Sequence, residues 1–138
     1  MLPSPVTAFA FRLPPGADLK RELFAVATAH GWQAAAVLTC VGSLSAYCLR
    51  FADRREGVTR VGAFEIVSLV GTLSASAAHL HIGLADADGA MVGGHVLDGC
   101  VIRTTAELVV VELPALAFRR QPDAATGYDE LVVHPRET

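Results

Sequence analysis

The sequence has few groups that could grip a polyanion. Lys20 is its one lysine, and its 11 basic residues are outnumbered by 14 acidic ones, which gives a formal net charge of −3 at pH 7. Proteins that bind nucleic acid through phosphate contacts need a basic face, and the sequence has no lysine-rich tail to supply one. This balance makes direct DNA binding an unfavourable hypothesis.

Signals for the membrane or for export are also missing. The uncharged stretch at residues 66–85 is nominally long enough to span a bilayer, but it contains His79, His81 and several hydroxyl side chains, which make insertion costly. Residues 1–15 lack the basic start and apolar block of a signal peptide. We therefore expect a cytoplasmic protein with no membrane contact.

Cysteine is scarce and carries no metal-binding pattern. Cys40, Cys48 and Cys100 are odd in number and are not spaced as in C-x-x-C motifs. Buried, reduced thiols in a cytosolic protein are the expected state, with no disulfide within the chain.

The sequence does contain enough apolar material for one core. Of its 138 residues, 52% are hydrophobic and 18% are charged. This composition predicts a single domain over residues 1–138, with a core at about 9–113 and a C-terminal tail at 114–138.

The pattern predicts one helix and many strands. Asp18 is a suitable N-cap for a helix over residues 19–30, and Gly31 stands where a left-handed C-terminal cap belongs. Strands are predicted at residues 33–40, 43–51, 64–73, 78–85, 90–96, 101–113 and 131–133. The fold class is therefore α+β, with a curled, mostly antiparallel sheet of about seven strands and one main helix. So much sheet beside a single helix leaves a face uncovered, and oligomerisation commonly covers such faces.

The residues most suggestive of chemistry are three histidines. His79 and His81 stand at positions i and i+2 of a strand, so their side chains share one face at roughly 6.5–7 Å along the chain. A three-residue turn ending at Gly89 would pair Asp86 with Ala90 and place His95 directly across from His81. A two-residue turn would put His95 on the opposite face.

Three neutral imidazoles on one face form a set of metal ligands. On zinc or a similar divalent ion, His79, His81 and His95 would leave one coordination position open, as catalytic zinc sites do. The alternative is three hydrogen-bonded histidines on a polar face. Gly93 and Gly94 precede His95 and would permit a close approach by the backbone or by a neighbouring chain.

Four charged side chains lie within the predicted strands or beside them. Glu65 and Glu107 interrupt apolar runs and either face solvent or lie near the metal as second-shell carboxylates. Arg12 and Arg50 are expected to be ion-pair partners of such acids.

Several motifs together resemble the prokaryotic branch of the PPC domain (Plants and Prokaryotes Conserved domain), over roughly residues 9–113. They are residues 13–19 (LPPGADL), 42–44 (GSL), 64–74 (FEIVSLVGTLS), 79–86 (HLHIGLAD) with Gly89, 93–95 (GGH) with Gly99, and 104–107 (TTAE). The resemblance implies an antiparallel sheet with one helix, assembled as a homotrimer. It also implies a fold related to acetolactate decarboxylase, whose zinc is held by histidines, and a metal on the three histidines in at least part of this branch.

Three functions follow as hypotheses. The first is a homotrimeric binding and assembly module that carries a metal on the three histidines and contacts a protein or a small-molecule ligand. The second is a metal-dependent lyase or hydrolase that uses the open position on the ion. The third is DNA binding, because plant members of the family carry AT-hook segments; this sequence has no Arg-Gly-Arg-Pro hook and no basic extension.

Overall fold

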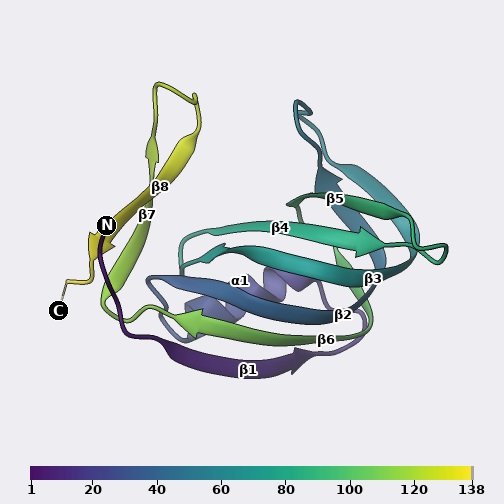
Figure 1. Ribbon diagram of the computed structural model, residues 1–138, viewed down its shortest axis with the longest axis horizontal. Helices are drawn as coiled ribbons and strands as arrows, with labels where there is room; N and C mark the ends of the chain where they lie inside the picture. Colours follow the sequence, from purple (N-terminus) through teal and green to yellow (C-terminus); the bar gives the residue numbers. More distant parts are fainter. Residues whose placement is uncertain (138) are drawn as a thin grey trace.

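The computed structural model describes residues 1–137, and within them the chain forms a curled sheet that carries one helix (Figure 1). The elements in chain order are β1 (Thr7–Leu13), α1 (Leu19–Ala29), β2 (Ala35–Arg50), β3 (Val58–Leu73), β4 (Ala78–Ala85), β5 (Met91–Val96), β6 (Val101–Glu112), β7 (Leu116–Pro122) and β8 (Asp129–Pro135). The α+β prediction, with an antiparallel sheet and one helix, is confirmed. No helix described in this range is long and apolar enough to cross a membrane.

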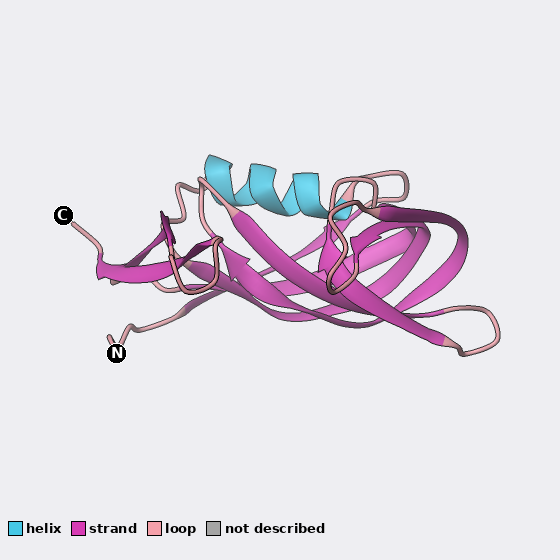
Figure 2. Cartoon of the chain, turned by 90° about the horizontal axis from the view of Figure 1, so that it is seen from above, coloured by secondary structure: helices cyan, strands magenta, loops and turns pink. Residues whose placement is uncertain are grey.

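The helix forms where the sequence pattern places it. Asp18 caps its first turn, because its side chain accepts a hydrogen bond of 3.0 Å from the backbone N–H of Arg21. Leu19, Leu23 and Ala27 are fully buried and lie on the side of the helix that covers one face of the sheet (Figure 2). The helix thus closes the core from one side.

The main sheet has six antiparallel strands in the order β1-β6-β2-β3-β4-β5. β2 and β3 are 16 residues each, or about 50 Å if fully extended, and irregular pairing between Leu44 and Ala46 accompanies their bending. The end of β2 also pairs with β5, opposite Val96 and His95. The edge strand β5 therefore curls back onto β2, and this closure brings the end of β2 beside the histidines.

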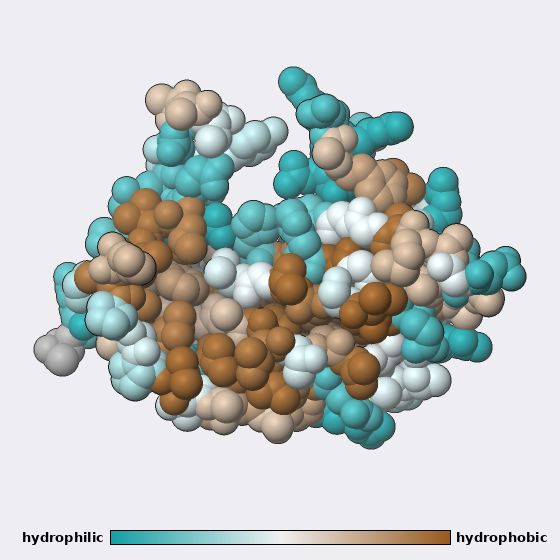
Figure 3. All heavy atoms as spheres, in the orientation of Figure 1, coloured by the Kyte–Doolittle hydropathy of each residue, from teal (hydrophilic) through white to brown (hydrophobic). Residues whose placement is uncertain are grey.

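The two faces of the main sheet differ in cover. Below α1 the core contains fully buried residues such as Leu44, Leu80 and Val110. On the face away from α1, Leu38 is 65% exposed and Val41 is 57% exposed, and hydrophobic side chains spread over this face in Figure 3. Within one chain, the second face of the sheet has no covering layer.

Three expectations about strands need correction. The two strands predicted at residues 33–40 and 43–51 are one strand, β2, because β3 and β6 pair with it on both sides of Gly42, opposite Ile66 and Ala106. β1 was not expected as a strand, and it forms by pairing along its whole length with β6. Residues 114–138 were expected to be a tail with one short strand, but β7 and β8 pair there as a two-stranded hairpin, called the C-terminal hairpin below.

The C-terminal hairpin lies beside the main sheet (Figure 1). A few contacts at its base join it to the rest of the chain. The backbone N–H of Phe118 donates to the carbonyl of Gln33 at 2.9 Å, and Leu116 and Phe118 pack on Ala34 in a small separate core. Arg136 pairs with Glu112 of β6 at 3.2 Å. These contacts hold the base of the hairpin and leave its far end standing away from the sheet.

Candidate metal centre

β4 carries two of the histidines on its outward face. Its residues alternate between buried Leu80, Ile82 and Leu84 and exposed or half-buried residues, so His79 and His81 both point away from the core. The apolar half of the alternation anchors the strand and thereby sets the direction of both imidazoles.

The turn after β4 brings in the third histidine. The backbone N–H of Asp86 donates to the carbonyl of Ala90 at 3.0 Å, and Gly89 takes a φ of +82° at the last position of the three-residue loop. The side chain of Asp86 also accepts hydrogen bonds from the N–H groups of Asp88 and Ala90. In this register His81 lies directly across from His95, which confirms the predicted pairing.

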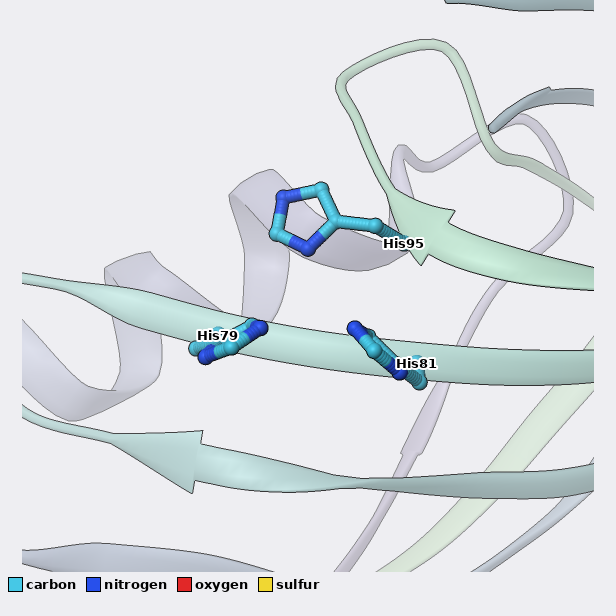
Figure 4. Close-up of side chains that lie close together, drawn as sticks. All are labelled: His79, His81 and His95. Carbon is cyan, nitrogen blue, oxygen red and sulfur yellow. The ribbon is translucent and has the colours of Figure 1, made fainter. Parts of the chain in front are cut away.

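His79, His81 and His95, called the histidine cluster below, approach one another closely. One ring nitrogen of each lies within 4.8 Å of a ring nitrogen of the other two. The ring centroids are 5.1 Å apart for His79 with His81 and with His95, and 5.6 Å for His81 with His95. Figure 4 shows the rings on β4 side by side, with the ring of His95 reaching toward them from β5.

The local electrostatics favour neutral rings. Desolvation, and then the neighbouring Arg50, lower the pKa of His95 to about 4. Desolvation, followed by Arg120, also lowers the pKa of His79. At neutral pH both rings therefore carry the free lone pair that a metal ligand needs.

The histidine cluster fits a divalent ion. The Nδ1 atom of His95 is buried and has no hydrogen-bond partner among residues 1–137. An unsatisfied buried nitrogen is costly unless something else binds it. Three imidazole donors within bonding reach of one point suit zinc and similar ions and leave a coordination position for a further ligand.

Three hollows open over the histidine cluster, and two of them are lined by His95. One, of about 400 Å³, is lined by Arg50, Ala78, His79, His95, Arg120, Tyr128, Asp129 and Glu130. The other, of about 570 Å³, is lined by Arg50, His81, Gly93, Gly94, His95 and Tyr128, together with residues 51–55 of the loop between β2 and β3. In Figure 3 this region is the polar notch between two projecting arms.

Sequence reasoning missed several residues of these hollows. Arg120, Tyr128 and Glu130 come from the C-terminal hairpin, which was expected to be a tail, and Arg50 was expected only as an ion-pair partner. The order of residues along the chain gives no signal for the first three, because only the packing of the hairpin base brings them to the histidine cluster.

The two carboxylates predicted to lie near the metal are found elsewhere in the structure. Glu65 is exposed and pairs with Ala85, which is four residues along β4 from His81, or roughly 13 Å at the rise of a strand. Glu107 lies on β6 between Arg12 of β1 and Val41 of β2. The structure brings neither residue to the histidine cluster, and Glu130 is the glutamate that lines the hollow.

Glycines allow the strands around the cluster to approach closely. A side chain at Gly71, whose φ is +153°, would place its Cβ 2.1 Å from the carbonyl oxygen of His79. A Cβ at Gly94 would lie 2.9 Å from the carbonyl oxygen of Arg50. The close approach expected at Gly94 is therefore made by a strand of the same chain.

The fold is a curled antiparallel sheet under one helix, and three histidines lie on the outward face of two adjacent strands. The protein is therefore a sheet domain with a cluster of three histidines. The profile of the Plants and Prokaryotes Conserved (PCC) domain matches residues 3–114. The chain belongs to this family, which is the PPC family of the resemblance above.

Relatives of known structure share the fold. A hypothetical protein from Salmonella is 43% identical, with a TM-score of 0.97 over 99% of each chain. The metal-containing protein AF0104 from Archaeoglobus fulgidus is 27% identical, with a TM-score of 0.82 over 96% of this chain and 98% of that one. A protein from Staphylococcus aureus similar to α-acetolactate decarboxylase (18% identity, TM-score 0.50, 73% of this chain and 50% of that one) supports the predicted relation in fold.

Curated relatives are much longer. The bifunctional protein GlmU of Synechococcus sp. (strain JA-2-3B'a(2-13)) is 45% identical over 135 residues, which are 98% of this chain and 21% of that protein. The chain thus spans about a fifth of the length of the curated relatives it matches.

Proposed function

We propose that this chain is a cytoplasmic, homotrimeric assembly and binding module that holds one divalent ion, zinc, on His79, His81 and His95. The observation that supports the ion most strongly is the buried, unpartnered Nδ1 of His95 within a cluster whose ring nitrogens lie within 4.8 Å of one another. The description of the Archaeoglobus fulgidus relative as metal-containing agrees with this proposal.

Each part of this chain has a distinct task at the ion. The histidine cluster supplies three neutral nitrogen ligands, and the main sheet fixes their directions through the pairing of β4 with β5. When bound, the ion supplies an open coordination position that polarises an oxygen ligand. The hollow above the cluster admits a small molecule to that position.

The metal is tested by elemental analysis of protein dialysed against zinc. We expect one ion per chain in the unchanged protein and less than about a tenth of that in His81→Ala, because two imidazoles bind zinc much more weakly than three. His134→Ala is the matched control, since His134 lies on β8 and lines none of the three hollows over the cluster. Full occupancy in folded His81→Ala protein would overturn the proposal.

The exposed face of the main sheet supports the trimer. Val67 is 56% exposed and Val70 is 57% exposed, and they lie away from α1 with Leu38 and Val41. An apolar face of this kind is covered in solution when identical chains close in a ring. Light scattering after size exclusion should give the mass of three chains, and a stable monomer at micromolar concentration would contradict this assembly.

A metal-dependent lyase or hydrolase is the second candidate, and one observation favours it. Tyr128 and Glu130 line the same hollow as His79 and His95, so groups able to move a proton stand near the open position of the ion. If the chain is such an enzyme, Glu130→Gln should abolish turnover of its substrate, because the amide cannot move a proton, while the metal content stays unchanged. Unchanged turnover in this variant would leave Glu130 without a role in the reaction.

We do not include DNA binding in the proposed function, although a relative from Bacteroides thetaiotaomicron with 21% identity is described as a proposed DNA-binding protein. The net charge of −3 offers no phosphate-tracking face. The chain should show no sub-micromolar affinity for AT-rich duplex DNA at physiological salt, and retention on such DNA would contradict this expectation.

A further inference from the structure

Two arginines flank the histidine cluster from different strands. Arg50, near the end of β2, pairs directly with His95 in the short β2–β5 ladder. Arg120, from the C-terminal hairpin, donates through Nη2 to the hydroxyl of Thr72 at 3.4 Å, and Thr72 pairs with His79 across β3 and β4. Both guanidinium groups line the 400 Å³ hollow together with His79 and His95.

Arg50 does not form the ion pair that the sequence led us to expect, and Arg120 forms none within residues 1–137 either. The salt bridges among residues 1–137 are made by Lys20, Arg21 and Arg136. Arg50 and Arg120 are half-buried and form no ion pair within this range, even though Asp129 and Glu130 line the same hollow. A half-buried guanidinium without a carboxylate leaves part of its bonding capacity unused.

Two positive charges lie beside the histidine cluster. Arg50 stands opposite His95 in the β2–β5 ladder, and Arg120 lines the same hollow as His79. A divalent ion on the cluster would add two further positive charges. An anion that enters the hollow would therefore contact a metal ion and two guanidinium groups.

The geometry points to a ligand class: Arg50 and Arg120 bind the carboxylate of a small organic acid whose neighbouring oxygen occupies the open position of the metal. This inference rests on the proposed metal function. Guanidinium groups pair with carboxylates through two parallel hydrogen bonds, and zinc accepts hydroxyl and carbonyl oxygens. A 2-hydroxy or 2-oxo acid presents both groups on adjacent carbon atoms and fits a hollow of 400 Å³.

The C-terminal hairpin is then the part of the chain that selects the ligand. Arg120 lies beyond residues 3–114, the range matched by the family profile. The histidine cluster and Arg50 lie within that range, so the metal ligands and one of the two arginines belong to the family domain. The second arginine, Arg120, is contributed by the C-terminal segment of this chain.

Titration calorimetry with glycolate on the zinc-loaded, full-length protein tests the inference. Arg120→Gln and Arg50→Gln should each weaken glycolate binding about ten- to hundredfold, the range for loss of hydrogen bonds to a charged group. Arg119→Gln is the matched control, because Arg119 is the next residue on β7 and lines none of the three hollows over the histidine cluster. The uncharged analogue glycolamide should bind the unchanged protein at least about tenfold more weakly than glycolate does.

The outcomes separate the two proposals. Zinc content is measured in every variant, and a protein that binds no zinc refutes the proposed function itself. If zinc is bound but glycolate binds Arg119→Gln and Arg120→Gln equally, the role of Arg120 is refuted. If inorganic phosphate binds in an Arg120-dependent way and glycolate does not bind, the site takes an anion and the assignment to a carboxylic acid is overturned.

Discussion

The histidine cluster and Arg120 are held by two regions of very different construction. The cluster lies on β4 and β5, which belong to the main sheet and are anchored by fully buried residues such as Leu84 and Val96. Arg120 lies on the C-terminal hairpin, which touches the rest of the chain mainly at its base. From this comparison we expect that the proposed metal binding and ligand binding can be altered separately, because a change in the hairpin leaves the histidine-bearing strands β4 and β5 intact.

The largest effect is expected where a strand of the main sheet passes the cluster. Gly71→Ala would bring a Cβ to within 2.1 Å of the carbonyl oxygen of His79, so β3 and β4 would have to separate. We expect a loss of about 3–5 kcal/mol of unfolding free energy, together with loss of zinc. Urea denaturation and metal analysis measure the two effects.

Gly16→Ala is the control for Gly71→Ala. Gly16 also has a positive φ, +82°, but a Cβ there would have no atom within 4 Å. It should cost only about 1–2 kcal/mol, the strain of a left-handed backbone, and should retain zinc. Equal losses in the two variants would refute the importance of close strand approach at the cluster.

A smaller effect is expected in the C-terminal hairpin. Phe118→Ala would remove the largest side chain from the small core formed with Ala34 and Leu116. The hairpin should lose about 2–3 kcal/mol of local stability, below the range for the centre of a large core, and become sensitive to proteases. Zinc content should stay at the level of the unchanged protein, and zinc loss would show that the two regions are not separable.

A different kind of effect is expected from alkaline pH, which acts on the main sheet. Burial raises the pKa of Cys40 and of Cys100 to about 11, above the ordinary value of 9.0. Both thiols are therefore protonated in the folded state when they would ionise in the unfolded chain. Their contribution is fully present below pH 9 and is lost as the pH rises to 11.

Urea denaturation at pH 8 and pH 10.5 measures this loss. The midpoint should fall between the two pH values in the unchanged protein, and the fall should be smaller in the Cys40→Ala, Cys100→Ala double variant. The hairpin strands β7 and β8 contain no cysteine. The rate of proteolysis within them should therefore rise more in Phe118→Ala than it does in the unchanged protein when the pH is raised. A fall of equal size in the double variant would contradict the assignment to these thiols.

The histidine cluster could be predicted from the sequence because local rules determine it. The two-residue period of a strand places His79 and His81 on one face, and the turn at Gly89 fixes the register that adds His95. Strand boundaries could not be placed as well. Gly42 suggested a break, but pairing on both sides keeps β2 continuous.

The position of the C-terminal hairpin could not be predicted, although a strand at residues 131–133 was, because contacts distant in sequence determine where the hairpin lies. Phe118 bonds to Gln33, and Arg120 bonds to Thr72. The hydrophobic pattern of residues 114–138 does not indicate that Gln33 or Thr72 is a partner. The same limitation misplaced the acidic partner of the site, because Glu65 lies in a strand and was visible in the sequence pattern, whereas Glu130 reaches the hollow only through the packing of the hairpin.

X-ray absorption at the zinc edge of the metal-loaded protein tests the central claim most directly. Three imidazole ligands predict a first shell of three nitrogens and one oxygen donor at about 2.0–2.1 Å, with the outer-shell pattern of histidine rings. Addition of glycolate should change the oxygen donor and leave the three nitrogens in place. A sulfur shell at about 2.3 Å, or a first shell of oxygen atoms without imidazole, would contradict the assignment of the ion to His79, His81 and His95.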